Sequence, residues 1–310
     1  MIDLQHIRNN INHEVFYCNS SAPTTTGWQT WTKPRNAKLV SIVAIGGGGG
    51  GGGNRSGGLR GGGGGGSGAV TQLIIPANLL PDTLFLSVGK GGDGAGNGLA
   101  PGVDGGISYV CIAPEIISGS VVIQSGNVAA QGGGQGAGVG TALGGAGETS
   151  FTYVPGLSAA SVFYCALGIF QSTPGARGGD GNSGAATNIT ALSASILTGG
   201  AGGSGNSGAS ANGASITGVG LVPTIPGGVA AGGSGSAGYQ TYRPNDLVSQ
   251  RVPFLATGGS GGASDSTSGL GGDGGPGAIG CGGGGGGAGA TNGGDGGRGG
   301  DGVIIITTHF

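Results

Sequence analysis

Glycine recurs at every third position over long stretches of this chain, and that spacing limits the conformations available to it. The frame runs through residues 271–289, slips by one residue at Asn292 and resumes over residues 293–302. A polyproline II helix has three residues per turn and rises about 3.1 Å per residue, so this spacing leaves one face as bare backbone. Because such a helix makes no internal hydrogen bonds, its amide and carbonyl groups must pair with neighbouring segments. The pattern predicts a lattice of extended glycine helices packed side by side.

Two other glycine-rich states share this composition. A collagen triple helix requires about 15–20 % proline or more, whereas only 13 of the 310 residues are proline, and the glycine frame is interrupted. A disordered linker goes with low hydrophobicity and high charge, but 36 % of the residues are hydrophobic and 8 % are charged. We therefore prefer an ordered lattice formed by one chain that folds back on itself.

Runs of apolar, mostly β-branched residues border the glycine tracts and are expected to form strands. One run covers residues 38–45 and ends abruptly at Gly46, and another lies near the end of the chain at residues 303–307. No segment has a convincing helical period. We expect a mainly β and irregular fold: a small β-sheet or sandwich base with a packed lattice of polyglycine II helices, and little or no α-helix. Further strands are expected at residues 70–75, 84–88, 108–112 and 121–124.

The chain divides into two unequal regions. Residues 1–26 are mixed in composition and contain no glycine tract, which favours an N-terminal attachment arm outside the core. Residues 27–310 are interpreted as one glycine-rich domain of strands and polyglycine II helices. Its tracts lie near residues 46–68, 89–106, 132–147, 175–184, 199–208, 227–238 and 258–302.

Charge and hydropathy argue against several classes of partner. The net charge is −2 and the 11 basic residues are scattered, so no basic stripe predicts a nucleic-acid or anionic-membrane surface. Apolar runs such as residues 39–45 are far shorter than the roughly 18 residues of a membrane span. The N-terminus lacks the features of a secretory signal. We expect no nucleic-acid partner and no membrane insertion. The cysteines have no CxxC spacing and are interpreted as packed, reduced thiols: Cys18, Cys111, Cys165 and Cys281.

Aspartate recurs in the motif Gly-Gly-Asp-Gly, and residues 296–303 fit a calcium-binding repeat. One match in so glycine-rich a chain is weak, because calcium needs about 6–8 oxygen ligands. We expect each aspartate to end a tract or to lie on its solvated face, where its side chain bonds local backbone. No metal and no cofactor are predicted. The aspartates of the motif are Asp93, Asp180, Asp273, Asp295 and Asp301.

No catalytic machinery is visible in the sequence. Matches to GxGxxG arise by chance in such a chain, and no phosphate-binding loop motif is present. A polysaccharide-degrading enzyme would need clustered carboxylates, whereas the carboxylates between the tracts are widely separated. We expect no enzymatic activity. These carboxylates are Glu115, Glu148, Asp246 and Asp265.

Aromatic residues gather in two segments between the tracts, residues 148–174 and 239–257. Exposed tyrosine and arginine gain free energy by stacking on a ligand or hydrogen-bonding to it. Each aromatic residue could equally cap the lattice and shield its ends. The candidates for ligand contact are Phe151, Tyr153, Tyr164, Tyr239, Tyr242 and Arg243.

Four segments resemble a known family. They are residues 28–34, residues 37–46 with the glycine block that follows, residues 84–92, and residues 299–306. Together they resemble the glycine-rich domain of bacteriophage tail-fibre proteins. The alternation of glycine tracts with variable segments is also similar to the distal receptor-binding adhesins of T-even-like phages, in which the tracts form a packed polyglycine II sandwich.

The resemblance implies a noncatalytic virion protein, assembled in the host cytoplasm, that binds a bacterial surface glycan or outer-membrane protein. The loop candidates above would then contact the receptor. The arm would join other virion proteins, and both a monomer and a homotrimer remain open. The alternative is a purely architectural component such as a head fibre, capsid decoration or baseplate protein. Candidates for virion attachment are Ile2, Leu4, Ile7, Phe16 and Tyr17.

Overall fold

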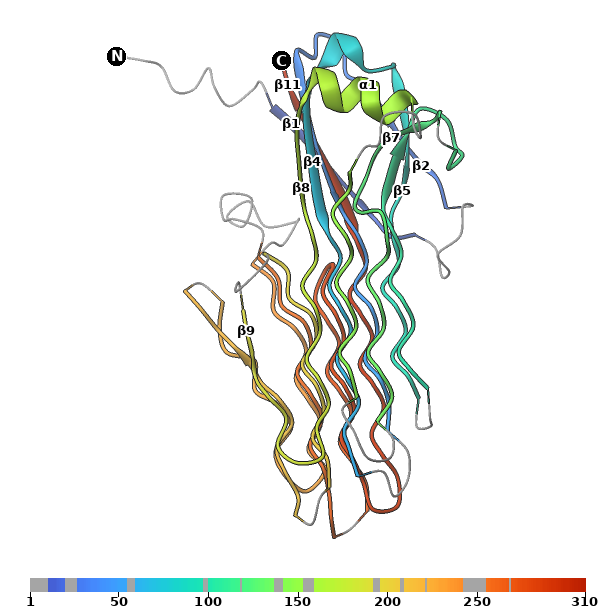
Figure 1. Cartoon of the computed structure of the whole chain (residues 1–310). Coiled ribbons are helices and arrows are strands. Elements are labelled where there is room, and N and C mark those ends of the chain that lie inside the picture. The colour runs from blue at the N-terminus through green and yellow to red at the C-terminus, as the bar shows by residue number, and fades with distance from the viewer. Residues whose placement is uncertain are drawn as a thin grey trace, which may run out of the picture.

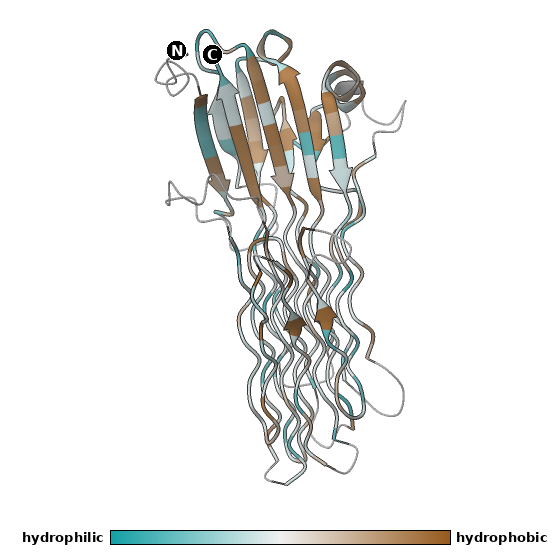
Figure 2. Ribbon diagram, turned by 90° about the vertical axis from the view of Figure 1, so that its left-hand side faces the viewer, coloured by the Kyte–Doolittle hydropathy of each residue, from teal (hydrophilic) through white to brown (hydrophobic). Residues whose placement is uncertain are grey.

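The protein has a β-sandwich at one end, from which extended segments run side by side to the opposite end (Figure 1). Hydrophobic residues concentrate in the strands of the sandwich (Figure 2). The computed structural model describes residues 11–19, 27–54, 59–96, 100–117, 119–136, 142–152, 159–191, 196–206, 209–220, 222–241, 255–267 and 269–310.

The larger sheet of the sandwich has five antiparallel strands in the order β1-β11-β3-β4-β8. Strands β3, β4 and β11 lie where the apolar runs predicted them, whereas β1 and β8 were not expected. Residues 11–17 are therefore an edge strand of the sheet rather than a separate arm. The bounds are β1 (Ile11–Tyr17), β11 (Val303–His309), β3 (Leu39–Ile45), β4 (Val70–Pro76) and β8 (Ile169–Thr173).

The smaller sheet has four antiparallel strands in the order β2-β5-β6-β7. Strands β5, β6 and β7 confirm the sequence prediction, and β2 adds a fourth strand. The bounds are β2 (Gln29–Thr32), β5 (Thr83–Ser87), β6 (Tyr109–Cys111) and β7 (Val121–Gln124). A short parallel pair, β9 (Ile189–Thr190) and β10 (Ile216–Thr217), lies within the glycine-rich part.

Helical structure is minor in the described part of the chain. A single turn of 3₁₀ helix, η2 (Ala77–Leu79), follows β4, and α1 (Ala159–Leu167) lies across the end of the sandwich (Figure 1). Neither is long and apolar enough to cross a bilayer. The mainly β and irregular fold class is thus confirmed, with one short helix.

The two sheets enclose the main hydrophobic core. Burial alternates along β3 and β5, as expected when one face of each strand packs inward. Fully burying a large aliphatic side chain stabilises the fold by about 1.5–3 kcal/mol. The largest fully buried side chains of this core are Trp31, Ile42, Leu73, Ile75, Leu84, Leu86, Ile123, Ile304 and Ile306.

The sandwich strands continue directly into the glycine tracts, which form the expected lattice. Strand β3 runs into residues 46–53, and every third residue of this tract bonds the same neighbour: Gly48 and Gly51 donate to the carbonyls of Gly300 and Gly297. In all, the tract donates to residues 63–69, 103–106 and 297–300, and accepts from residues 92–95, 133–136 and 283–286. The tract therefore has six hydrogen-bonded neighbours: the N–H groups of residues 46–52 donate to them and the carbonyls of residues 48–53 accept from them.

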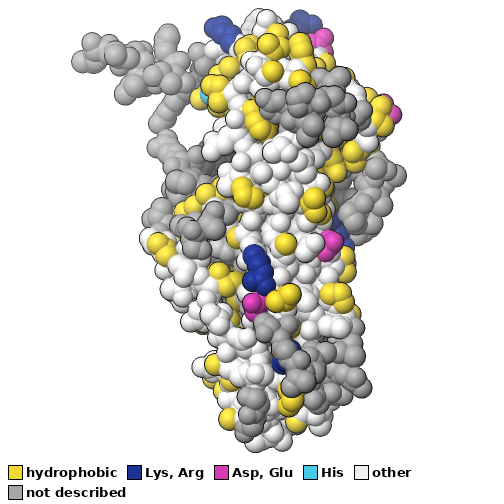
Figure 3. All heavy atoms as spheres, viewed as in Figure 1, with side chains coloured by type: hydrophobic (Ala, Val, Ile, Leu, Met, Phe, Trp, Pro, Cys, Tyr) yellow, Lys and Arg dark blue, Asp and Glu magenta, His cyan; other side chains and the backbone are white. Residues whose placement is uncertain are grey.

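Uninterrupted glycine blocks occupy the interior of this lattice. Residues 46–53, 61–66 and 282–287 each bond to six neighbouring segments. A Cβ at Gly51 would lie 1.9 Å from the Gly284 carbonyl oxygen, far closer than atoms can approach. Tracts with glycine at two of every three positions occur in both places: at the surface the third side chain points outward, as at Asp295 and Arg298, and in the interior it is small and buried, as at Ala201 and Ala263. The visible flank of the lattice is accordingly mostly backbone and small polar groups (Figure 3).

Candidate functional site

The two described aromatic candidates from residues 148–174 pack on the sandwich. Phe151 is 6 % exposed in the core and meets Phe170 edge-to-face, with ring centroids 5.6 Å apart. Tyr164, on α1, is half-buried against the same core, and burial raises the pKa of its hydroxyl. Phe151 thus serves the core in this structure. Tyr153 lies outside the described residues.

The other aromatic segment lies elsewhere. Tyr239 packs against a separate apolar cluster that includes Ile189, Ile216 and Leu255, in the part of the lattice that holds β9 and β10. The structure therefore does not bring Phe151 and Tyr239 into one surface. Tyr242 and Arg243 lie outside the described residues, so their role stays a prediction.

The attachment candidates are divided in the same way. Phe16 packs against the sandwich core from β1, and Tyr17, at the end of that strand, is 40 % exposed. Ile2, Leu4 and Ile7 lie outside the described residues.

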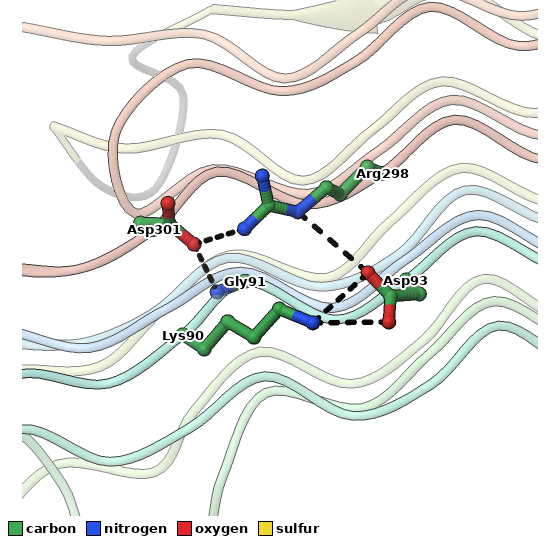
Figure 4. Close-up of polar contacts among 5 residues, drawn as sticks. All are labelled: Lys90, Gly91, Asp93, Arg298 and Asp301. Atoms are coloured by element: carbon green, nitrogen blue, oxygen red, sulfur yellow. Dashed lines mark hydrogen bonds and ion pairs between the residues drawn. The ribbon is translucent and has the colours of Figure 1, made fainter. Parts of the chain in front are cut away.

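Four charged side chains form a cluster on the lattice surface where residues 89–96 run beside residues 293–302 (Figure 4). Lys90 Nζ lies 3.1 Å from Asp93 Oδ2, and Arg298 Nε lies 3.7 Å from Asp93 Oδ1. Arg298 Nη2 lies 2.5 Å from Asp301 Oδ1. Exposed pairs of this kind contribute about 0–1 kcal/mol each. The two cations and two carboxylates balance, so this charged cluster is electrically neutral overall.

Aspartates at the lattice surface bond neighbouring tracts rather than only local backbone. Asp301 Oδ1 accepts the Gly91 N–H at 2.8 Å, and Asp180 Oδ1 accepts the Gly144 N–H at 2.8 Å. Asp104 and Asp273 accept the N–H groups of Gly132 and Asp295, each at 2.9 Å. These carboxylates supply acceptors at the lattice boundary, where the next tract is missing. The described residues contain no cluster of three or more His, Cys, Asp or Glu suited to a metal ion.

A buried carboxyl group lies where the sandwich meets the lattice. Glu148 is fully buried; its Oε1 accepts from Ser125 Oγ at 2.6 Å and its Oε2 accepts from the Ala69 N–H at 2.7 Å. Burial raises its pKa to about 8, against the lowering effect of these bonds. Gly46 leaves room for it, since a Cβ there would lie 1.9 Å from Oε2. Glu148 is thus a largely protonated structural group at neutral pH, a role that its sequence position did not reveal.

The cysteines offer no nucleophile among the buried thiols. Cys111, Cys165 and Cys281 are buried thiols that form no disulfide. Burial raises the pKa of each of these three thiols to about 12. They therefore stay protonated at neutral pH and have little nucleophilic character.

The far-end turns, described at residues 59–60, 229–233, 265–267 and 289–293, connect tracts at the end opposite the sandwich (Figure 1). Large aliphatic side chains at or beside them are exposed: Leu59 by 48 %, Val229 by 73 % and Leu270 by 60 %. Asn206 bonds two turns together, since its N–H donates to the Leu59 carbonyl at 3.1 Å and its Nδ2 to the Asp265 carbonyl at 3.2 Å. The turns thus present apolar groups on a hydrogen-bonded framework.

The chain matches a known protein family. A family model described as a glycine-rich domain matches residues 24–309, almost the whole chain. A search of curated proteins found no match.

Proposed function

We propose, for a chain that belongs to the glycine-rich domain family, a noncatalytic attachment role in a bacteriophage virion, as a tail-fibre or tip adhesin. In this proposal the sandwich joins other virion proteins, and the far-end turns contact a glycan or protein of the bacterial surface. The resemblance to phage fibres supports the assignment of this chain to a virion. The architecture supports the orientation, with the sandwich toward the virion and the turns toward the cell. Strand β1 belongs to the sandwich, and the far-end turns lie at the opposite end of the molecule.

One observation carries the proposal: sandwich strands pass without a break into a lattice whose interior tracts bond six neighbours. A connection of this kind has no hinge, so force applied at the turns reaches the sandwich through the backbone. The bonds that Asn206 makes to Leu59 and Asp265 order the turns before any ligand arrives. Pre-ordering lowers the entropy lost on binding. Stiffness and pre-ordering suit a protein that presents a surface at a distance.

Lack of catalysis is part of the proposal. Glu148 is buried beneath the sandwich, whereas Asp265 lies beside a far-end turn and bonds Thr267 through Oδ1 at 2.8 Å. Glu115 lies in the loop between β6 and β7. These separate positions provide no pair of carboxylates for glycosidic cleavage.

Adsorption to cells tests the proposal. Fluorescently labelled full-length chain is incubated with a panel of bacterial cells, beside a variant with Leu59→Asp, Val229→Asp and Leu270→Asp. We expect the native chain to adsorb to some strains and the variant to lose that adsorption. The matched control carries Val103→Asp and Ile169→Asp, which are 54 % and 71 % exposed away from the turns. Equal adsorption by turn variant and native chain, or no adsorption to any strain, contradicts the proposal.

The lattice flank favours a second candidate, an architectural virion component that packs against other virion proteins. Val103 and Leu143 are 54 % and 61 % exposed on tracts of the lattice surface, and Val128, just before the tract at residues 132–147, is 54 % exposed. Aliphatic side chains gain free energy when a neighbouring subunit covers them. If Val103→Asp and Leu143→Asp abolish incorporation into particles while the turn variant does not, the architectural role replaces the adhesin role.

A further inference from the structure

A surface hollow of about 340 Å³ lies where the sandwich meets the lattice, on the side of β1. Strand β1 pairs with β11, with Tyr17 opposite Val303. Residues 293–302 continue β11 into the lattice, but the sequence after Tyr17 has no glycine tract and reaches β2, in the other sheet, at Gln29. No tract of the described lattice continues β1, so a hollow remains between the end of this strand and the tract below it.

The lower wall of this hollow is the upper end of the next surface tract. The Gly277 N–H donates to the Arg298 carbonyl and the Gly280 N–H to the Asp301 carbonyl, each at 2.9 Å. Pro276 to Ile279 thus end beside Arg298 and Asp301, below Tyr17. Because the walls are strands and hydrogen-bonded tracts, the hollow is formed before a ligand binds.

The hollow offers both donors and acceptors. Gln240 Oε1 accepts the Ile279 N–H at 3.3 Å, which holds this side chain in the lining of the hollow, where its Nε2–H groups are donors for a ligand. Asp301 uses Oδ1 for Gly91 and for Arg298, so Oδ2 is the acceptor that it offers. Arg298 adds donors beyond the Nη2–H that Asp301 accepts. A ligand rich in hydroxyl groups, each both donor and acceptor, matches this set.

Charge and shape narrow the ligand further. Arg298 and Asp301 belong to the neutral charged cluster, in which Lys90 and Asp93 are also paired (Figure 4). An ion therefore gains little here over a neutral molecule. Tyr17, a residue that is 40 % exposed and lines the hollow, contributes an aromatic ring with a polar hydroxyl. At about 340 Å³ the hollow lies at the small end of ligand sites, which span about 300–1,000 Å³.

We propose that this hollow binds a neutral saccharide of mono- or disaccharide size, with Tyr17 against the sugar ring and Gln240, Arg298 and Asp301 bonding its hydroxyl groups. The site is distinct from the far-end turns, so it does not depend on the attachment role proposed above. It would be a glycan contact near the sandwich, at the end opposite the far-end turns.

Saturation-transfer difference NMR on the full chain tests this site, with glucose, galactose, N-acetylglucosamine and maltose as neutral probes and glucuronic acid as a charged one. We expect at least one neutral sugar to bind, and Tyr17→Ala to weaken it about tenfold, equivalent to about 1.4 kcal/mol. Gln240→Glu keeps the acceptor for Ile279 while it removes the amide donors, and it should weaken binding to a similar extent. Phe163→Ala removes another exposed aromatic ring, on α1, and should leave binding unchanged.

Thermal melting of each variant checks that it is folded, and Gln240→Glu keeps the test decisive if Tyr17→Ala does not fold. The proposal is overturned if no neutral sugar binds the native chain. It is also overturned if a folded Tyr17→Ala or Gln240→Glu binds as tightly as the native chain, or if glucuronic acid binds more tightly than every neutral sugar. Loss of cell adsorption in the turn variant has no bearing on these outcomes.

Discussion

The sandwich and the lattice belong to one continuous chain but are held together by different groups. In the sandwich, large side chains such as Leu73 and Trp31 are fully buried between two sheets. In the glycine blocks of the lattice, the contacts are between backbones, and the space between tracts excludes even a methyl group at Gly51. Side-chain cores respond to substitution in proportion to the volume lost or gained. In a lattice whose tracts pack closely because they lack side chains, even one added methyl group clashes with a neighbouring backbone.

Gly51→Ala, in the lattice, should have the largest effect on stability. Its Cβ would lie 1.9 Å from a carbonyl oxygen of a tract that is fixed on all sides, so the lattice cannot relax around it. We expect destabilisation above about 5 kcal/mol, at the exceptional end for single substitutions. The matched control is Gly96→Ala, where a Cβ meets nothing within 4 Å. It should be neutral or stabilise by up to about 1 kcal/mol. Urea denaturation measures both; equal effects would contradict the six-neighbour packing.

Leu73→Ala probes the sandwich alone. This side chain is fully buried in the main hydrophobic core. Its truncation should therefore destabilise the protein by about 2–5 kcal/mol through lost burial and a residual cavity. Chemical denaturation of this variant, with one spectroscopic probe in the sandwich and one in the lattice, would measure the unfolding of each region. Because β4 is continuous with residues 61–68, we expect both regions to unfold in one transition. Separate transitions would show that the lattice folds independently.

Glu148 links the two regions through a titratable group. Its pKa is about 8 when folded and 4.5 ordinarily, so the folded state binds the proton more tightly. Its favourable contribution is therefore fully present below about pH 4.5 and is lost as the pH rises to about 8. The expected loss is on the order of a few kcal/mol. Glu148→Gln keeps an amide that bonds Ser125 and the Ala69 N–H, and it should flatten this pH dependence. An unchanged profile would place the titration elsewhere.

Asp301 tests the lattice surface and should give the smallest effect. Asp301→Asn keeps an oxygen for the Gly91 N–H but removes the ion pair with Arg298, so we expect a loss of no more than about 1 kcal/mol, reduced by salt. Asp301→Ala removes the acceptor as well and should cost about 1 kcal/mol more. Thermal melting at low and high salt separates the two contributions. A larger loss of stability in Asp301→Asn than in Asp301→Ala would contradict the hydrogen bond between Asp301 and the Gly91 N–H.

Local patterns in the sequence were sufficient for much of the fold. The β-branched runs of β3, β4 and β11 and the threefold glycine frame each report their own conformation, because alternation and period are local properties. Long-range pairing was not readable. Strand β1 carries Asn12, His13 and Glu14, and only its pairing with β11 makes it a strand. Helix α1 has nine residues, too few for a clear period.

The candidate sites were harder to predict for the same reason. Phe151 and Tyr239 share an aromatic character in the sequence, yet the chain path carries one into the sandwich core and the other to the lattice flank. The hollow beside Tyr17 arises from a strand that ends where its neighbour continues, which no local pattern records. One signal was available in the sequence. Asp295, Arg298 and Asp301 are spaced by three residues, which places their side chains on one face of a helix with three residues per turn.

Hydrogen–deuterium exchange of the glycine amides in residues 46–53 tests the central claim most directly. Each of these amides is buried, and those of residues 46–52 donate to the sandwich or to a neighbouring tract through the bonds that extend β3 into the lattice. We therefore expect protection comparable to that of the amides of β3 itself, and far above that of a flexible glycine linker. Exchange at the rate of an unstructured chain in residues 46–53, beside a protected β3, would contradict the lattice.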